Sequence, residues 1–475
     1  MIETLLAAAE GKTLEFKRDL ASPKPLLKTL VAFANSAGGR LVIGVADDKR
    51  IIGVEDPLEE EERLCNLISD TIAPRLVPNV EMVTVEGKTL LIAEVFLSGS
   101  RPHFLRAEGS EHGVYVRLGS TNRQADRELI AELRRSVGGG SFDELPMAAL
   151  STADLDLKTA QDLFQGRREL NEHGLLTLKL LRKEQAALVP TTGAILLFGA
   201  DRIAHFPDAW VQCGRFVGTD KAAIFDHTEL HEVLPRMVEG IMLFLKKHAM
   251  RGADLSGIQR KDTWSIPLTI LREVVINALV HADYSQRGAP IRVAIFDDRI
   301  EIENPGILLP GLTIEDMKEG VSKIRNPVIA RVFRELGLIE QWGSGIRRIF
   351  KEAVEQQLPM PQIVELGMRL RFVVPLRIPL ATPTINKPPE AQVEAQVEAQ
   401  VDLDILDACS HQPLSSAEIA SALGHKQLSG NLRKAIPRLR TAGLLEYTIP
   451  EKPTSRLQKY RPTHQGRSLL NNQKS

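Results

Sequence analysis

The chain has 475 residues, more than one hydrophobic core usually organises, so we expect three or four domains. Its 43% hydrophobic and 25% charged residues are typical of soluble proteins, and a net charge of −1 excludes a general basic footprint for nucleic acid. Three widely spaced cysteines, Cys65, Cys213 and Cys409, exclude a disulfide framework and a close metal-ligand pair. The N-terminus has no signal-peptide pattern and no apolar run reaches membrane-spanning length, so we expect a cytoplasmic protein without a membrane partner.

Residues 1–138 are expected to form one compact mixed domain. Residues 13–17 alternate polar and apolar side chains as a half-buried strand does, and residues 23–35 carry an apolar helical face that ends at Gly38-Gly39. The pattern predicts further strands at 41–45, 51–54, 80–85, 89–96 and 114–118, and a second helix at 59–72. Consecutive glycines at 138–140 mark a boundary.

Three acidic residues and a lysine near the start form a candidate metal site. Glu10 and Glu15 are five residues apart, which would put them about 140° apart on one helix and on opposite faces of one strand. They converge only if Glu10 ends a helix and Glu15 lies on the following strand, where Lys17 shares its face. Asp47 follows the next strand, a place where active-site groups often gather. Such a cluster can hold a divalent metal and cut a phosphodiester; solvated surface charge is the alternative.

The middle of the chain, residues 150–378, alternates helices and strands. Residues 192–199 are a continuous apolar run that we expect to be a buried strand. Residues 267–281 have a helical pattern, and strands are expected at 291–296 and 299–303.

One face of the 267–281 helix carries three polar residues. Glu273, Asn277 and His281 recur every four residues, so they share that face. A glutamate can orient a water, and an asparagine oxygen can hold magnesium beside a triphosphate. A polar helix face without a ligand is the alternative. The sequence has no Gly-x-x-x-x-Gly-Lys-Ser/Thr phosphate loop, so we do not expect a helicase of that kind.

A linker and a basic module follow. Residues 379–402 are a linker with an Ala-Gln-Val-Glu repeat, whose valines favour a helical spacer that pairs with a second copy, or an unpartnered linker. Residues 403–470 predict a winged helix, with Ser415 or Ser416 capping its second helix and Pro437 inside its third. Basic residues on the third helix and the wing are the expected DNA contacts: Arg433, Lys434, Arg438, Arg440, Lys452, Arg456, Lys459 and Arg461. Protein docking is the alternative use of such a module.

The N-terminal motifs resemble a Schlafen AlbA-type domain. The resemblance covers roughly residues 1–130 and rests on Glu10-Gly-Lys-Thr-Leu-Glu15-Phe-Lys17, Ala32-Phe-Ala-Asn-Ser-Ala-Gly-Gly39 and Leu41-Val-Ile-Gly-Val-Ala-Asp47. In animal Schlafen proteins the positions matching Glu10, Glu15 and Asp47 form a three-carboxylate, metal-dependent ribonuclease site for structured RNA such as tRNA. Prokaryotic members are usually labelled as DNA-binding or regulatory, so the resemblance implies two functions. The expected nucleic-acid contacts here are Lys17, Arg101, Arg106 and Arg117.

Residues 190–375 resemble the divergent GHKL-type ATPase domain that follows Schlafen AlbA-type domains in RecG-like proteins. The motifs are Leu271-Arg-Glu-Val-Val-Ile-Asn277, Phe296-Asp-Asp-Arg-Ile-Glu-Ile-Glu-Asn-Pro-Gly306, Arg325-Asn-Pro327 and Gln341-Trp-Gly-Ser-Gly345. The resemblance implies that Glu273 assists hydrolysis and that Asn277 binds magnesium. The other implied nucleotide-binding positions are His281, Asn304, Gly306, Arg325, Gly343 and Gly345. Asn304 stands where GHKL proteins read adenine with an aspartate; it has an acceptor oxygen but no charge, so we expect binding more than fast hydrolysis.

Together these patterns predict an α+β multi-domain protein: a Schlafen AlbA-type mixed domain, a GHKL-like α/β sandwich and a C-terminal winged helix. We expect a nucleic-acid-binding, ATP-binding regulator of the DNA-binding transcriptional-regulator type. The alternative is a metal-dependent endoribonuclease that acts on tRNA-like RNA through Glu10, Glu15 and Asp47. The expected cofactors are ATP with Mg²⁺ or Mn²⁺, and the expected partners are DNA or structured RNA and a second copy in a homodimer.

Overall fold

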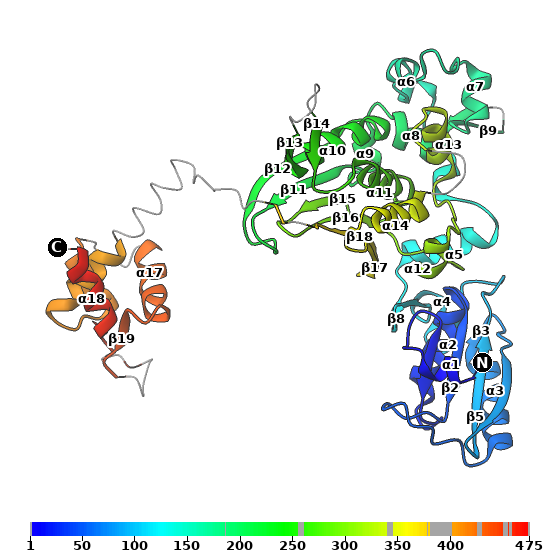
Figure 1. The fold of residues 1–475 in the computed structure, drawn as a ribbon, viewed down its shortest axis with the longest axis horizontal. Helices are drawn as coiled ribbons and strands as arrows, with labels where there is room; N and C mark the ends of the chain where they lie inside the picture. Colours follow the sequence, from blue (N-terminus) through cyan, green and yellow to red (C-terminus); the bar gives the residue numbers. More distant parts are fainter. Residues whose placement is uncertain are drawn as a thin grey trace. The chain divides into compact units, whose positions relative to one another are not determined.

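A computed structural model describes residues 2–185, 187–254, 261–339, 345–377, 379–380, 401–424, 430–449, 455 and 458–473. The chain divides into two compact units, Met1–Pro383 and Thr384–Ser475 (Figure 1). Both belong to a mixed α/β, multi-domain architecture with several small sheets. Among the residues described, no helix combines the length and the apolar character that a membrane crossing needs.

The N-terminal part of the first unit is built on a four-stranded sheet of order β1-β2-β5-β4. The four strands are β1 (Leu14–Lys17), β2 (Gly39–Ile43), β5 (Lys88–Val95) and β4 (Asn79–Val85). Helix α2 (Pro23–Asn35) begins with a proline in its first turn and buries nine residues, which is why it forms the core of this part. The other elements are α1 (Ile2–Ala7), α3 (Pro57–Thr71), β3 (Ile72–Ala73), β6 (Phe104–Leu105), α4 (Gly109–His112), β7 (Tyr115–Leu118), β8 (Thr121–Gln124) and α5 (Arg127–Val137).

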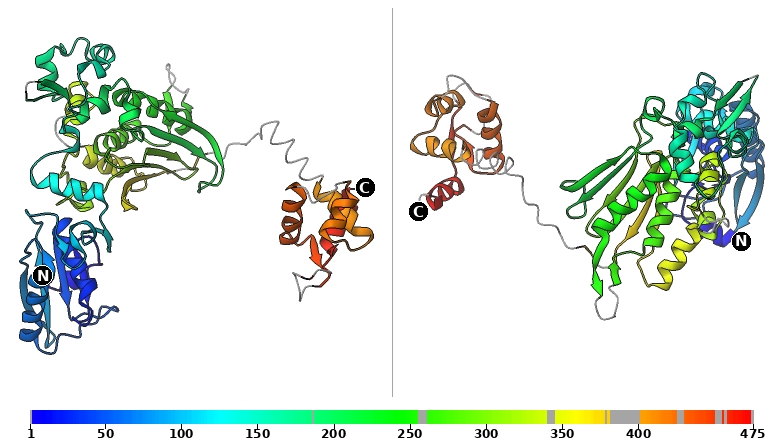
Figure 2. Two further views of the ribbon diagram at one scale, coloured as in Figure 1. Left: turned by 180° about the vertical axis from the view of Figure 1, so that it is seen from behind. Right: turned by 90° about the horizontal axis from the view of Figure 1, so that it is seen from above.

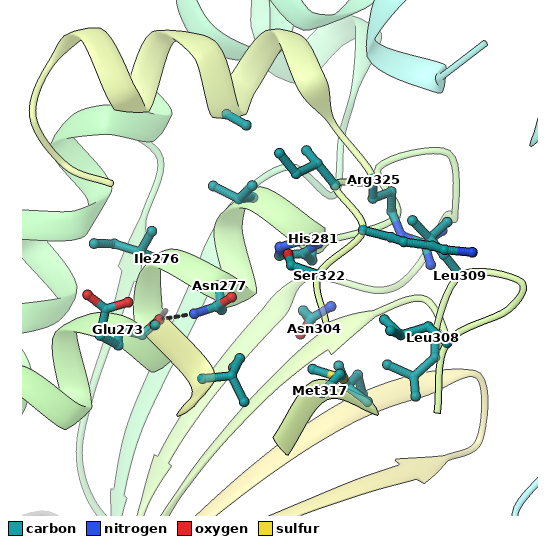
Figure 3. A pocket seen from close by; sticks show the side chains of 18 of the residues that line it. Glu273, Ile276, Asn277, His281, Asn304, Leu308, Leu309, Met317, Ser322 and Arg325 are labelled. Atoms are coloured by element: carbon teal, nitrogen blue, oxygen red, sulfur yellow. Dashed lines mark hydrogen bonds between the residues drawn. The ribbon is translucent and has the colours of Figure 1, made fainter. Parts of the chain in front are cut away.

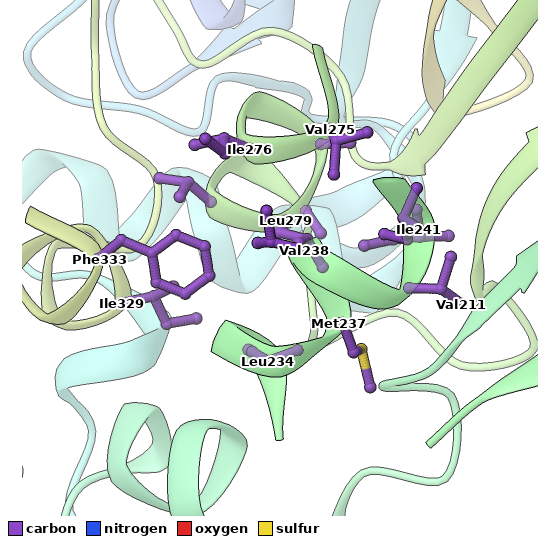
Figure 4. Packing of buried hydrophobic residues seen from close by; sticks show 14 of the residues in the cluster. Val211, Leu234, Met237, Val238, Ile241, Val275, Ile276, Leu279, Ile329 and Phe333 are labelled. Atoms are coloured by element: carbon purple, nitrogen blue, oxygen red, sulfur yellow. The ribbon is translucent and has the colours of Figure 1, made fainter. Parts of the chain in front are cut away.

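A second, six-stranded sheet organises the rest of this unit, in the order β12-β11-β15-β16-β18-β17. Its strands are β12 (Ile224–Leu230), β11 (Val211–Phe216), β15 (Ile291–Ile295), β16 (Arg299–Pro305), β18 (Arg369–Pro375) and β17 (Gln362–Leu366). Helices α10 (Leu234–Ala249) and α11 (Leu268–His281) pack on this sheet, and α14 (Gly345–Glu355) packs on α11 (Figure 2). Figure 4 shows side chains of α10, α11 and α13 (Pro327–Glu335), together with Val211 of β11, in one shared core.

The remaining elements of the unit are short. They are η1 (Phe142–Glu144), η2 (Thr152–Asp154), α6 (Leu157–Phe164), α7 (Glu172–Thr177), β9 (Leu181–Glu184), β10 (Ala187–Pro190), α8 (Thr192–Phe198), α9 (Arg202–His205), β13 (Met250–Asp254), β14 (Lys261–Trp264) and α12 (Ile314–Glu319). The prediction of a buried strand at residues 192–199 is wrong, because α8 occupies this run. The Thr191 side chain accepts a hydrogen bond from the Ala194 amide and starts the helix. An apolar run buried on every side has no periodicity that separates strand from helix.

The second unit holds helices and a small hairpin around its own core. Residues 401–411 are helical and are followed by α16 (Ser416–Ala422), α17 (Gly430–Thr441), β19 (Leu445–Tyr447), β20 (Tyr460–Pro462) and α18 (His464–Gln473). Ser415 caps α16 in a capping box with Glu418, as the sequence predicted. Pro437 stays inside α17. The valines at 393 and 397, in the Ala-Gln-Val-Glu repeat, lie outside the described residues.

Candidate functional site

A cavity of about 250 Å³ lies between helix α11, strand β16 and the loop that follows β16. Figure 3 shows the side chains of Asn277, His281 and Asn304 around it. Its polar and charged lining residues are Glu273, Asn277, His281, Asn304, Ser322, Lys323, Arg325, Arg334 and Arg348. The structure therefore gathers most of the predicted nucleotide-binding residues in one place. Gly343 is also among those predictions, but it lies outside the described residues.

Helix α11 supplies the acidic end of the cavity. The amide nitrogen of Asn277 donates a 2.7 Å hydrogen bond to the Glu273 carbonyl, one turn earlier, so its oxygen is the atom left for a ligand. The Glu273 carboxylate forms an ion pair with Arg348, which comes from the first turn of α14. A Cβ on Gly345 would meet this carboxylate, so a larger residue there would require the Glu273 side chain to move. Arg348 was not among the residues predicted from the sequence, although it follows Gly345 by one helical turn.

Asn304 is the polar residue at the centre of the cavity. It lies on β16, is 2% exposed, and its amide nitrogen donates a 3.1 Å hydrogen bond to the Pro305 carbonyl. This hydrogen bond identifies the amide nitrogen and the amide oxygen of Asn304, because a flipped amide would place its oxygen against the Pro305 carbonyl oxygen. Within the described part of the chain the Asn304 oxygen is buried and has no hydrogen-bond partner. A buried acceptor without a donor is rare in native proteins and indicates a ligand that donates one.

His281 and Arg325 form another side of the cavity. Burial, together with the nearby Arg325 guanidinium, lowers the pKa of His281 to about 4, so the imidazole is neutral at pH 7. Arg325 forms an ion pair with Glu132 of α5 and donates to the Ile307 carbonyl. Gly306 has a φ of 100°, and a Cβ there would lie 2.9 Å from the Cβ of Asp283. The turn after β16 therefore needs a glycine.

The cavity is joined to the N-terminal part of the same unit. The Glu365 carboxylate accepts a 2.8 Å hydrogen bond from the amide of Leu308, a cavity residue, and forms a 2.7 Å ion pair with Lys12. The Gly311 amide donates to the Ser36 carbonyl at 2.6 Å. The sequence had no signal for Glu365, because its partners are far away along the chain.

The three N-terminal carboxylates have different surroundings. Helix α1 ends at Ala7, so the condition that Glu10 ends a helix is not met. The Glu10 carboxylate accepts a 2.9 Å hydrogen bond from the Phe16 amide, and Asp47 is exposed on a turn. Glu15 is buried, and its two oxygens are held by Lys17 and by Arg117.

No group of three or more histidine, cysteine, aspartate or glutamate side chains is placed to hold a metal ion in the ranges that the structure covers. The expected cluster of Glu10, Glu15 and Asp47 is thus not formed here. Their catalytic and metal-binding roles stay predictions.

The predicted basic contacts of the N-terminal part separate into two kinds. Arg117 is 1% exposed and binds Glu15, the Gly11 carbonyl and the Asn122 side chain, so it is a structural residue and not a surface contact. Its exposure corrects the prediction that it touches nucleic acid. Arg106 is exposed, and Arg101 is partly buried against Ser98 and Ser136.

Three of the predicted basic contacts in the C-terminal unit are paired with acids. Arg438 pairs with Asp402 at 2.9 Å, Lys459 with Glu418 at 3.0 Å and Arg461 with Glu446 at 2.7 Å. Arg433 is exposed on α17, and the Arg440 guanidinium lies 4.8 Å from the ring centre of Tyr447. Lys452 and Arg456 lie outside the described residues, as does the side chain of Lys434. The expected basic surface is therefore less positive than the residue count implied.

Two family models match parts of this chain. Residues 10–126 match the model described as Schlafen, AlbA_2, and residues 288–374 match the model described as putative ATP-dependent DNA helicase recG C-terminal. The second match includes Asn304, Gly306 and Arg325 but begins after helix α11. No curated protein matches the chain.

Two solved structures are similar to it. The DIP2311 protein from Corynebacterium diphtheriae is 21% identical, with 99% of this chain and 97% of that chain covered and a TM-score of 0.42. The N-terminal domain of a putative ATP-dependent DNA helicase RecG-related protein from Nitrosomonas europaea is 28% identical, with 26% of this chain and 90% of that chain covered and a TM-score of 0.22. The family models confirm the resemblance found in the sequence: one segment of the chain matches the Schlafen AlbA_2 model and a later segment matches the RecG C-terminal model.

Proposed function

We propose that this protein is an ATP-binding, nucleic-acid-binding regulator of the DNA-binding transcriptional-regulator type. ATP occupies the cavity beside α11 in the manner of a GHKL-like domain, and the C-terminal unit acts as a winged helix. The observation that carries the nucleotide part is the buried, unpartnered oxygen of Asn304 inside that cavity.

The chemistry of Asn304 selects between purines. Adenine presents an amino group, a donor, where guanine presents a carbonyl oxygen, an acceptor. The free Asn304 atom is an acceptor, because its amide nitrogen is already used by the Pro305 carbonyl. ATP satisfies this atom, whereas GTP would place two oxygens against each other. The site therefore favours adenine without the charge that an aspartate would supply.

The rest of the lining fits a magnesium–triphosphate. The free oxygen of Asn277 is a hard ligand of the kind that Mg²⁺ prefers, and Lys323 and Arg334 supply positive charge for phosphates. Magnesium bound there would neutralise the phosphate oxygens. Glu273 is held by Arg348, so it is oriented but not free to activate a water. This arrangement supports binding with slow turnover.

The test is calorimetric titration of the full chain with ATP and with GTP, each with magnesium. Asn304→Ala removes the acceptor and should weaken ATP by about 1–3 kcal/mol, or roughly 5- to 150-fold, without improving GTP. Asn79→Ala, an exposed asparagine on β4, is the matched control. Equal affinity of the native protein for ATP and GTP, or an unchanged Asn304→Ala, would contradict the assignment. No binding of either nucleotide would overturn the proposed function.

DNA binding is proposed for the C-terminal unit, with Arg433 on α17 as its strongest candidate contact. Arg433 is exposed, whereas Arg461 already pairs with Glu446. Arg433→Gln should weaken duplex DNA binding and lower the slope of log affinity against log salt by about 1. Arg461→Gln should have the smaller effect. Fluorescence anisotropy over a salt series measures both, and equal effects would count against α17 as the DNA reader.

A metal-dependent endoribonuclease acting through Glu10, Glu15 and Asp47 has less support, because cations already hold both oxygens of Glu15. Incubation of the protein with tRNA and manganese tests it. Cleavage by the native chain that is lost in Glu15→Gln would revive this function. The homodimer is proposed on the valine repeat alone, and light scattering of the full chain measures it.

A further inference from the structure

A second cavity, of about 390 Å³, lies beside the first and has no role in the proposed function. The N-terminal part, α5 with the glycine loop after it, and the loop before α13 all contribute to its wall. The lining residues used below are Arg101, Glu132, Arg135, Glu144, Asp283, Lys323 and Arg325. Lys323 and Arg325 also line the first cavity, so the two cavities share a wall.

Three cations of this second cavity lie outside the ion pairs that the described residues form. Arg101, Arg135 and Lys323 form no ion pair with any residue that the structure describes. Lys323 is held in place by a 2.7 Å hydrogen bond to the Pro310 carbonyl, and Arg135 lies over the Phe142 ring at 5.5 Å. Positive groups gathered in a concave site favour an anionic ligand.

The acids in the wall do not cancel this charge. Glu132 is paired with Arg325, and Glu144 is paired with Lys179 outside the cavity. Asp283 is the carboxylate of this wall that remains, and its Oδ1 accepts a 2.6 Å hydrogen bond from the Ser285 hydroxyl. The three cations therefore outnumber it.

Two buried polar atoms at this site lack partners. In the described structure the Nε of Arg101 and the Oδ2 of Asp283 are buried without a hydrogen bond. Asp283 is 3% exposed, whereas the other two nitrogens of Arg101 bind the Ser98 carbonyl and the Ser136 hydroxyl. An unpartnered donor and an unpartnered acceptor on two residues that line one cavity favour a ligand that offers both an anion and a donor.

We propose that this second cavity is a binding site for a small phosphate monoester that also carries a hydroxyl or amino group. Arg101, Arg135 and Lys323 bind the phosphate, and Asp283 accepts a hydrogen bond from the hydroxyl or amino group. The volume falls in the range of small-molecule sites, about 300–1,000 Å³. The proposal does not depend on nucleotide binding in the first cavity. Lys323 is common to both cavities, but Arg101, Arg135 and Asp283 line the second and not the first.

The experiment is calorimetric titration of the full chain with ribose 5-phosphate, and in parallel with ribose and with inorganic phosphate. Ribose 5-phosphate should bind more tightly than phosphate, and ribose should not bind. The double variant Arg101→Gln, Arg135→Gln should weaken ribose 5-phosphate at least about tenfold. Arg134→Gln is the matched control, because Arg134 is the neighbour of Arg135 on α5 and does not line the cavity. Should the double variant fail to fold, Lys323→Gln replaces it, because that side chain is exposed.

Two further variants locate the ligand. Binding that persists in Asn277→Ala places it outside the first cavity, and binding lost in that variant would overturn the second site. In Asp283→Asn the side-chain oxygen still accepts the hydrogen bond from Ser285, but an amide nitrogen replaces the unpartnered carboxylate oxygen. Ribose 5-phosphate should then bind no more tightly than inorganic phosphate. A retained advantage would refute the role of Asp283. No binding of ribose 5-phosphate to the native chain, or equal binding to the double variant, would overturn the proposal as a whole.

Discussion

Asp143 offers the sharpest test of how the cavity beside α11 is held together. It lies in η1 and is fully buried, and its Oδ2 accepts hydrogen bonds from the Val328 amide at 2.7 Å and the Ile329 amide at 3.0 Å. These amides belong to the first turn of α13 and therefore have no acceptor within the helix. Helix α13 starts two residues after the cavity residue Arg325. Asp143→Ala removes the acceptor, whereas Asp143→Asn keeps one oxygen for both amides and turns its nitrogen toward Ser141.

The size of the effect follows from the two amides and one buried charge. Leaving two buried N–H groups unpaired costs about 1–3 kcal/mol each, so Asp143→Ala should be less stable than Asp143→Asn by about 2–6 kcal/mol. Burial raises the pKa of Asp143 from 3.8 to about 6, because desolvation outweighs its hydrogen bonds from Ser141 and the two amides. That shift corresponds to about 3 kcal/mol, at 1.36 kcal/mol for each pKa unit.

The sign of the pH dependence is determined by which state binds the proton more tightly. The folded pKa of Asp143 is above its unfolded value, so the folded state binds the proton better. The contribution of Asp143 to stability is therefore greatest below about pH 4 and is lost as the pH rises through 6. Asparagine does not titrate. The free energy of unfolding of Asp143→Asn, minus that of the native protein, should rise by about 3 kcal/mol across this window.

Urea unfolding of the full chain at a series of pH values measures this difference. The three tryptophans, Trp210, Trp264 and Trp342, all belong to the unit Met1–Pro383, so fluorescence reports on that unit. Subtracting the native curve from the Asp143→Asn curve removes the other titrating groups. A difference that stays flat from pH 4 to 7, or falls, would refute the reasoning about the buried charge. Equal stability of Asp143→Ala and Asp143→Asn would refute the role of the amides.

Three further predictions concern other parts of the chain. Arg117→Met leaves the buried Glu15 carboxylate without its guanidinium partner and should destabilise the protein by about 3–5 kcal/mol in urea unfolding. Adding Glu15→Gln should recover part of that loss. An unchanged unfolding midpoint in Arg117→Met would contradict the importance of this ion pair. Glu365→Gln removes the charge that holds the Leu308 amide and should weaken ATP binding severalfold by calorimetry, whereas unchanged affinity would separate this contact from the cavity. Ser415→Ala should lower the stability of the C-terminal unit by about 1 kcal/mol, because the cap of α16 is lost. The pKa of Glu418 is lowered to about 2, mainly by the hydrogen bond from the Ser415 amide, and it should stay well below its usual range in this variant because the amide remains. A large rise of this pKa in an NMR titration would show that the Ser415 hydroxyl holds the carboxylate instead.

The sequence by itself determined those features that neighbouring residues encode. The predicted helix at 23–35 has the same bounds as α2, because a proline start, an apolar face and a glycine stop are all local. Glu273 and Asn277 share a face of α11 because helix geometry alone aligns residues four apart. The capping box of Ser415 and Glu418 was predictable for the same reason.

Only the tertiary structure decided which distant residues meet. Arg117 and Glu15 are 102 positions apart, Arg325 and Glu132 are 193 apart, and Asp143 and Val328 are 185 apart. No local pattern encodes such pairs, because they form when separate elements pack and each buried charge must find a partner. Tertiary packing also decided that residues 192–198 form the helix α8 and that Arg117 is buried, although a surface position was expected for it. It also left the Asn304 oxygen without a donor, which depends on the walls that surround β16 and not on the residues beside it in the chain.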